Sequence, residues 1–304
     1  MKETKVEDYR IEKDSIGTRD IPGDVYYGVQ SLRAAENFHI TGLRIHPEII
    51  NSLAYIKKAA AITNCEVGML EKRKVQAIVQ ACDEILAGKF REDFIVDPIQ
   101  GGAGTSLNMN ANEVIANRAI ELLGGSKGDY SIINPNDDVN CSQSTNDVIP
   151  TAGKMTSLRL LKNLKHELLQ LHGALCKKAE EFNDVIKMGR TQLQDAVPIR
   201  LGQEFRAYSV AIMRDIHRME KAMGEMRTLN LGGTAVGTGL NADEAYLHRI
   251  VPILSEVSDM DLAQAYDLID ATQNLDVFVA VSGAVKACAV TLSKIANDLR
   301  LMSS

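Results

Sequence analysis

The sequence predicts a mainly α-helical protein, with an α-rich N-terminal domain followed by a bundle of long helices. Three segments, 151–183, 200–228 and 268–302, each carry a helical pattern of apolar residues with little interruption. At 1.5 Å per residue, each would form a rod of about 45–50 Å. Only 5% of the 304 residues are aromatic and none is Trp, so the core must be largely aliphatic. These observations favour helix packing over a sheet architecture.

The elements of the N-terminal domain follow from local signals. Residues 1–45 are expected to be irregular, with short extended runs at YRIEK (9–13) and VYYGVQ (25–30). Pro47 suits the first turn of a helix whose apolar residues recur as far as Ala60. Two further helices are predicted at about 70–87 and 107–123, and a glycine follows each. The predicted domains are 1–140 and 141–304.

The long helices need partners, because a helix of this length cannot bury its apolar stripe within one small domain. Residues 275–292 are apolar almost all round and are long enough to cross a membrane. Asp276, Lys286 and several small residues interrupt this run, so we interpret it as the centre of a bundle or oligomer. Three long helices make an incomplete bundle, and the chain is therefore expected to stop within a domain.

Charge and composition exclude several functions. The formal net charge of −6 argues against a nucleic-acid partner or an anionic membrane surface. The five cysteines form no C-x-x-C pair and the six histidines show no ligand spacing, so we predict no metal site. The N-terminus has no apolar signal-peptide core, which favours a cytoplasmic protein.

Three breaks between helices, 101–110, 134–147 and 187–198, share glycines, hydroxyls and amides with few charges. Each is expected to feed a helix N-terminus, where free N–H groups and hydroxyls bind carboxylates or phosphates. The same residues are common helix caps, so capping is the alternative for any single loop. A fourth segment, 232–241, is a looser example. No glycine loop continues into Gly-Lys-Ser/Thr, and a βαβ context is missing, which excludes two nucleotide-binding motifs.

Long ordered motifs resemble the aspartase/fumarase superfamily. They are GTRDIPGDVYYGVQSLRAAENF (17–38), GGAGTSLNMNANEV (101–114), NPNDDVNCSQSTNDVIPT (134–151), KMGRTQLQDAVPIRLGQEF (187–205) and GTAVGTGLN (233–241). The resemblance implies a three-domain helical subunit and a homotetramer whose active sites each combine three subunits. It also implies reversible elimination of ammonia from L-aspartate to give fumarate, without a cofactor.

The resemblance also implies substrate-binding residues. The positions that match the superfamily's motifs are Thr105, Ser106, Ser144, Thr145, Asn146, Thr191, Gln192 and Asn241. Asn136 and Asp137 align with a secondary anion site of fumarases. For Arg190, a structural ion pair is at least as good an interpretation as catalysis.

The sequence departs from the superfamily pattern at its end. The superfamily's flexible loop, with its base serine and its substrate-binding Lys and Asn, is expected beyond Ser304, so no catalytic base is assigned here. We therefore expect residues 1–304 alone to be inactive. Gln192 and the Ser144-Thr145-Asn146 triplet favour the aspartase branch over the fumarases. Fumarate hydration and a non-catalytic helical scaffold remain open alternatives.

Overall fold

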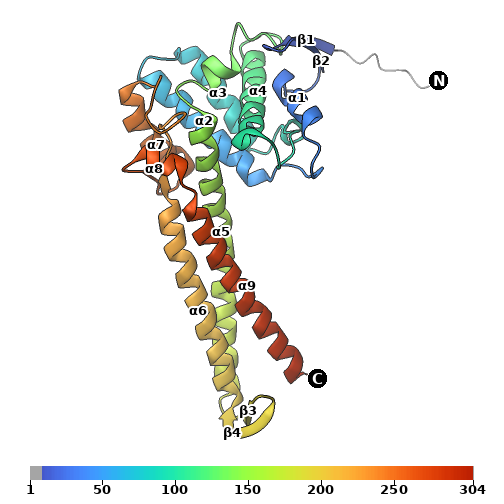
Figure 1. Ribbon diagram of the computed structural model, residues 1–304, viewed down its shortest axis with the longest axis vertical. Helices are drawn as coiled ribbons and strands as arrows, with labels where there is room; N and C mark the ends of the chain where they lie inside the picture. Colours follow the sequence, from blue (N-terminus) through green and yellow to red (C-terminus); the bar gives the residue numbers. More distant parts are fainter. Residues whose placement is uncertain (1–8, 304) are drawn as a thin grey trace, which may run out of the picture. The chain divides into compact units, whose positions relative to one another are not determined.

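The computed structural model describes residues 9–303, and it is mainly helical (Figure 1). The predicted fold class is confirmed. The chain forms two compact units, and each is built from two stretches of sequence. The first contains the residues up to Thr156 together with Arg227–Asn274, and the second contains Ser157–Met226 and the residues from Leu275 onward. The predicted boundary near residue 140 stays a prediction.

The first unit consists of packed helices with two small strand pairs and turns at its edges. α2 packs against α3 and α7, and α4 packs against α1 and α3. Their aliphatic side chains form the core, as the scarcity of aromatic residues predicts. The helices are α1 (Val29–Asn37), α2 (Pro47–Glu66), α3 (Lys72–Leu86), α4 (Thr105–Leu122), α7 (Glu244–Ser258) and α8 (Leu268–Gln273), with short helical turns at Arg91–Asp93, Gly102–Gly104 and Pro135–Val139.

Two of the strand pairs belong to this unit. β1 (Tyr9–Lys13) and β2 (Thr18–Pro22) form an antiparallel ladder, with Ile11 opposite Asp20. β5 (Thr228–Leu229) and β6 (Ala263–Gln264) are parallel. The pair β5–β6 holds the segment that follows Leu229 against the rest of the unit, because Gln264 Nε2 also donates to Leu231 O. This segment carries one of the candidate loops.

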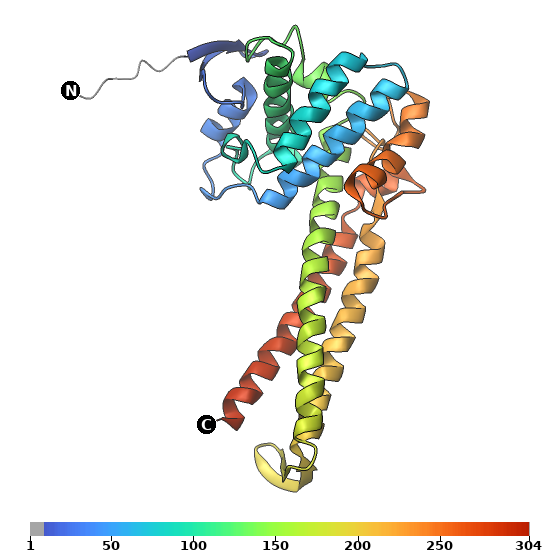
Figure 2. The ribbon, with the colours of Figure 1, turned by 180° about the vertical axis from the view of Figure 1, so that it is seen from behind.

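The second unit is built from long helices. α5 (Thr145–Glu181) begins in the first unit, and its later part lies beside α6 (Leu201–Met226) in both views (Figures 1 and 2). His172 Nδ1 lies 3.0 Å from Ser209 O across this contact. α9 (Asp276–Met302) packs on α6, where Tyr208 OH donates to Asp298 at 3.1 Å. β3 (Ile186–Thr191) and β4 (Gln194–Arg200) form the hairpin that joins α5 to α6.

The structure corrects three sequence predictions in detail. Residues 25–30 are not a strand: residues 25–28 have no regular secondary structure, and α1 begins at Val29. The segment 268–302 is not one rod, because Asn274 is extended and separates α8 from α9. The segment 187–198 does not simply feed a helix; most of it forms the β3–β4 hairpin. The segment KMGRTQLQDAVPIR has no regular alternation of polar and apolar residues, so local periodicity does not mark these strands.

α9 is the one helix among residues 9–303 whose length and composition would let it cross a membrane. Only 17% of its most apolar 18-residue window is buried in this chain. Val279 and Val290 are 72% and 63% exposed. An apolar face of this kind needs a cover, which residues 9–303 do not supply.

Candidate active site

The first candidate loop reaches α4 through a tight turn. Gly102, Ala103 and Gly104 all have positive φ (67°, 52° and 91°). This conformation favours glycine, which occupies two of the three positions. Thr105 begins α4; its side chain is exposed, and its hydroxyl donates to Gly102 O at 2.5 Å. Ser106 follows and is half-buried. The turn thus presents two hydroxyls at the N-terminal end of α4, where the helix dipole favours an anion.

The second candidate loop ends in a capping box at the start of α5. Asn146 N donates to Ser144 Oγ at 3.3 Å, and Ser144 N donates to Asp147 Oδ1 at 3.0 Å. The capping alternative therefore holds for Ser144. A capping hydroxyl still has its own hydrogen to donate, so capping and ligand binding are compatible.

A buried lysine forms hydrogen bonds with side chains of this loop. Lys57, on α2, is fully buried and donates to Asn140 Oδ1 at 2.8 Å and to Gln143 Oε1 at 3.0 Å. Burial lowers the pKa of Lys57 to about 7, and the charge of Asp147 partly opposes this shift. Because both contacts are to side chains within residues 140–143, the lysine holds in place the segment just before Ser144.

The first and second loops meet through α4. Asn108, one turn after Thr105, donates its side-chain N–H to Asn140 Oδ1 at 3.2 Å and to Thr145 Oγ1 at 3.4 Å. Because the Thr145 oxygen accepts this bond, its own O–H is left to donate elsewhere. Thr145 is half-buried and Asn146 is exposed.

The fourth loop and the segment just before it form hydrogen bonds with the start of α5. Asn146 Nδ2 donates to Ala235 O at 2.7 Å, and Asn230 Nδ2 donates to the Asn146 carbonyl at 3.0 Å. Asn241 lies further along this loop, is exposed and has a positive φ of 68°. Thus Thr105, Ser106, Ser144, Thr145, Asn146 and Asn241 all belong to the first compact unit.

Thr191 and Gln192 lie in the second compact unit. They stand at the tip of the β3–β4 hairpin, where Gln192 and Leu193 both have positive φ (50° and 62°), the conformation of a two-residue hairpin turn. Both side chains are exposed. Arg190 Nε lies 3.5 Å from Asp195 Oδ1, an exposed ion pair that agrees with the structural interpretation.

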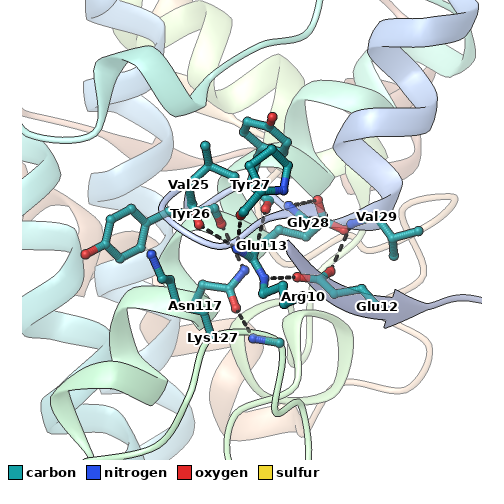
Figure 3. A network of polar contacts seen from close by, with 12 residues as sticks. Arg10, Glu12, Val25, Tyr26, Tyr27, Gly28, Val29, Glu113, Asn117 and Lys127 are labelled. Atoms are coloured by element: carbon teal, nitrogen blue, oxygen red, sulfur yellow. Dashed lines mark hydrogen bonds and ion pairs between the residues drawn. The ribbon is translucent and has the colours of Figure 1, made fainter. Parts of the chain in front are cut away.

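A second polar centre lies in the same unit, around the N-terminus of α1 (Figure 3). Glu113 accepts the backbone N–H groups of Gly28, Gln30 and Ser31 and the Ser31 hydroxyl. Glu12 accepts from Val29 N and Tyr130 OH. A Cβ on Gly28 would lie 2.5–2.7 Å from these groups, so only glycine fits. The two carboxylates cap α1 from distant parts of the chain.

A cavity of about 440 Å³ borders this centre, and Lys13, Arg33, Glu113 and Asn136 contribute to its lining. Asn136 lines this cavity, and its part in a secondary anion site stays a prediction. Asp137 is exposed, and its backbone N–H is capped by Asn134 Oδ1 at 3.1 Å. Within residues 9–303, no group of three or more His, Cys, Asp or Glu side chains is placed to hold a metal ion.

Sequence reasoning missed the buried support of the loops, namely Lys57, Asn108, Asp147 and Asn230. One signal was available. Lys57 lies four residues after Leu53 and three before Ala60, and therefore on the apolar stripe of its helix. A lysine on such a stripe indicates a buried cation that has a specific polar partner.

Comparison with known proteins identifies the family. A family model described as Lyase matches residues 17–304. The chain belongs to this lyase family. It is 57% identical to the aspartate ammonia-lyase of Bacillus subtilis, over 98% of this chain and 62% of that protein. It is 48% identical to the aspartate ammonia-lyase of Escherichia coli, over 97% of this chain and 62% of that protein. The chain spans just over three fifths of the length of these relatives.

Solved structures of the lyase family share the fold. A fumarate lyase:delta crystallin from Brucella melitensis bound to cobalt superposes with a TM-score of 0.96 at 50% identity, over 98% of this chain and 65% of that one. A class II fumarase from Schistosoma mansoni superposes with a TM-score of 0.94 at 33% identity, over 98% and 66%. The resemblance inferred from the sequence motifs is confirmed.

Proposed function

We propose that the protein is an aspartate ammonia-lyase that eliminates ammonia from L-aspartate, reversibly, to give fumarate. The observation that carries the proposal is the meeting of two hydroxyl-rich helix N-termini, α4 and α5, through Asn108 and Thr145. Such an arrangement suits a dicarboxylate, because N–H and O–H donors and helix dipoles all favour negative charge. The aspartate ammonia-lyases at 48–57% identity support this choice of substrate.

The chemistry needs donors where charge develops. A base takes a proton from the carbon beside the β-carboxylate, and the electron pair of the broken C–H bond moves onto that carboxylate. The C=C bond then forms as the C–N bond breaks and ammonia leaves. Donors placed in advance around the carboxylate lower the barrier, because the added charge is stabilised only in the transition state. We assign this task to Thr105, Ser106, Thr145 and Asn146, and we assign contacts to the remainder of the substrate to Ser144 and Asn241.

The hairpin residues Thr191 and Gln192 complete the proposed binding set, in keeping with the family resemblance. We place the base serine beyond Ser304 for the same reason. We further propose a cytoplasmic homotetramer with composite active sites. The exposed apolar face of α9 supports the assembly, since a second copy packed on Val279 and Val290 would cover it.

The proposal is tested by fumarate absorbance in the ultraviolet. Two proteins are compared: residues 1–304, and a chimera that joins residues 1–304 to the segment of the Bacillus subtilis relative that follows the matched region. We expect the chimera to form fumarate from L-aspartate and to hydrate fumarate to malate only weakly. Dominant malate formation would assign a fumarate hydratase instead. Turnover by residues 1–304 alone would place the base within them.

A further inference from the structure

Asp147 has a buried carboxylate that connects two loops. Its side chain is fully buried, and no ion pair to it occurs within residues 9–303. Oδ1 accepts the N–H of Ser144 at 3.0 Å, whereas Oδ2 accepts the N–H groups of Gly232 and Thr234, each at 3.1 Å. A capping box needs only the first of these bonds. The other two reach a segment about 85 residues further along the chain.

The bonds to Oδ2 change the interpretation of the fourth loop. Gly232 and Gly233 precede Thr234 in a turn whose N–H groups were expected to be free for a ligand. Two of these N–H groups already bind an anion, and that anion is the protein's own carboxylate. The loop therefore serves as the docking point for the start of α5. Two further bonds join the same segments, from Asn146 Nδ2 to Ala235 O and from Asn230 Nδ2 to Asn146 O.

We propose that Asp147 is a positioning residue, which fixes Thr145 and Asn146 against the Gly232–Ala235 turn so that their donors meet the substrate carboxylate in register. This inference rests on the proposed function, because it assigns a role within that substrate site. Asp147 itself is buried behind the donors and acts through them.

The protonation state of Asp147 affects its contacts with the Gly232–Ala235 turn. Burial raises the pKa of Asp147 to about 6, and its backbone hydrogen bonds and the charge of Lys57 partly oppose the shift. The titratable groups whose charges couple to it are Lys57 on α2 and Tyr246 on α7; Cys141 couples to Tyr246 in turn. Because the pKa of Asp147 is raised in the buried state, protonation favours that state, and the contacts between Asp147 and the turn should weaken as the pH rises through about 6.

The first test follows amide hydrogen exchange in residues 1–304, which requires no catalytic activity. In Asp147→Asn, an NH₂ group replaces one acceptor oxygen, so the amides that faced that oxygen, either Ser144 or the pair Gly232 and Thr234, should exchange at least tenfold faster. In the unaltered chain, exchange at these amides, corrected for intrinsic rates, should also accelerate as the pH rises through about 6. The matched control is Asp138→Asn. Asp138 lies in the same loop, accepts from Asn134 N and pairs with Lys74, and should leave these three amides unchanged.

The second test measures kinetics in the chimera. We expect Asp147→Asn to lower kcat/KM for L-aspartate about 10- to 100-fold, and to remove the part of its pH dependence that is centred near pH 6. Unchanged amide exchange in Asp147→Asn would refute the proposal that Asp147 fixes Thr145 and Asn146 against the turn. Faster exchange with unchanged kcat/KM and pH profile would reduce Asp147 to a structural role. If Asp147→Asn does not fold, the comparison of exchange in the unaltered chain below and above pH 6 decides alone. A chimera without aspartate turnover would refute the proposed function but leave the exchange result interpretable.

Discussion

Replacing Glu113 by Gln tests the buried carboxylate at the N-terminus of α1. Burial raises the pKa of Glu113 to about 6 from an ordinary 4.5; hydrogen bonds from Ser31 and Gln30 oppose this shift, and the nearby Glu12 adds to it. Since the folded-state pKa lies above the unfolded-state value, ionisation costs stability. The stabilising contribution is complete below pH 4.5 and is lost as the pH rises through 6.

The size of the effect follows from the pKa difference. A shift of 1.5 units corresponds to about 2 kcal/mol in the free energy of unfolding, of which about 1 kcal/mol develops between pH 5 and pH 7.5. Glutamine has no charge to lose, so Glu113→Gln should remove this pH-dependent part. The amide also sets an NH₂ group against backbone donors, and this adds a penalty that is independent of pH.

The assay is urea unfolding followed by tyrosine fluorescence at pH 5.0 and pH 7.5. The pH-dependent loss of stability should be about 1 kcal/mol smaller in Glu113→Gln than in the unaltered chain, because the constant penalty cancels in this difference. Glu36→Gln is the control, since Glu36 lies on the same helix but is exposed. If the free energy of unfolding depends on pH equally in Glu113→Gln and in the unaltered chain, within about 0.3 kcal/mol, the argument from burial is refuted.

Two further predictions concern the site and the assembly. In the chimera, Thr105→Ala and Thr145→Ala should each lower kcat/KM for L-aspartate about 10- to 100-fold, through loss of one charge-assisted hydrogen bond, whereas the serine variants keep the hydroxyl and should lose less. If the alanine and serine variants have equal kcat/KM, these residues serve only as helix caps. The exposed face of α9 predicts that residues 1–304 associate at micromolar concentration, and light scattering measures this. A monodisperse monomer would contradict the prediction.

The sequence predicted those features of the fold that depend on local periodicity. The long helices α5 and α6 follow directly from apolar spacing, and α2, α3 and α4 were found with bounds shifted by a few residues. α1 was missed because the acceptors at its N-terminus, Glu12 and Glu113, come from elsewhere in the chain. The break at Asn274 was missed because neither Gly nor Pro marks it.

The candidate loops were predictable because hydroxyls, amides and glycines are visible in composition. Their support was not, because it depends on which segments meet in the folded chain. Asp147 looks like an ordinary capping residue in the sequence, yet its second oxygen binds Gly232 and Thr234. Asn108 looks like any polar residue of α4, yet it joins the first loop to the second. Both contacts are tertiary, and no local pattern encodes them.

The buried charges explain how a loop of small polar residues is held still. Lys57 binds the side chains of Asn140 and Gln143, and Asp147 binds the backbone of Ser144. Residues 140–147 are thus held at both ends by buried groups of opposite charge. Within residues 9–303 neither group has an ion-pair partner, but each shifts the pKa of the other. Buried charges are costly unless they are hydrogen-bonded, so each is committed to its loop contacts. Under the proposed function, the donors of Thr145 and Asn146 would therefore be oriented before the substrate arrives, the condition under which donors stabilise developing charge most effectively.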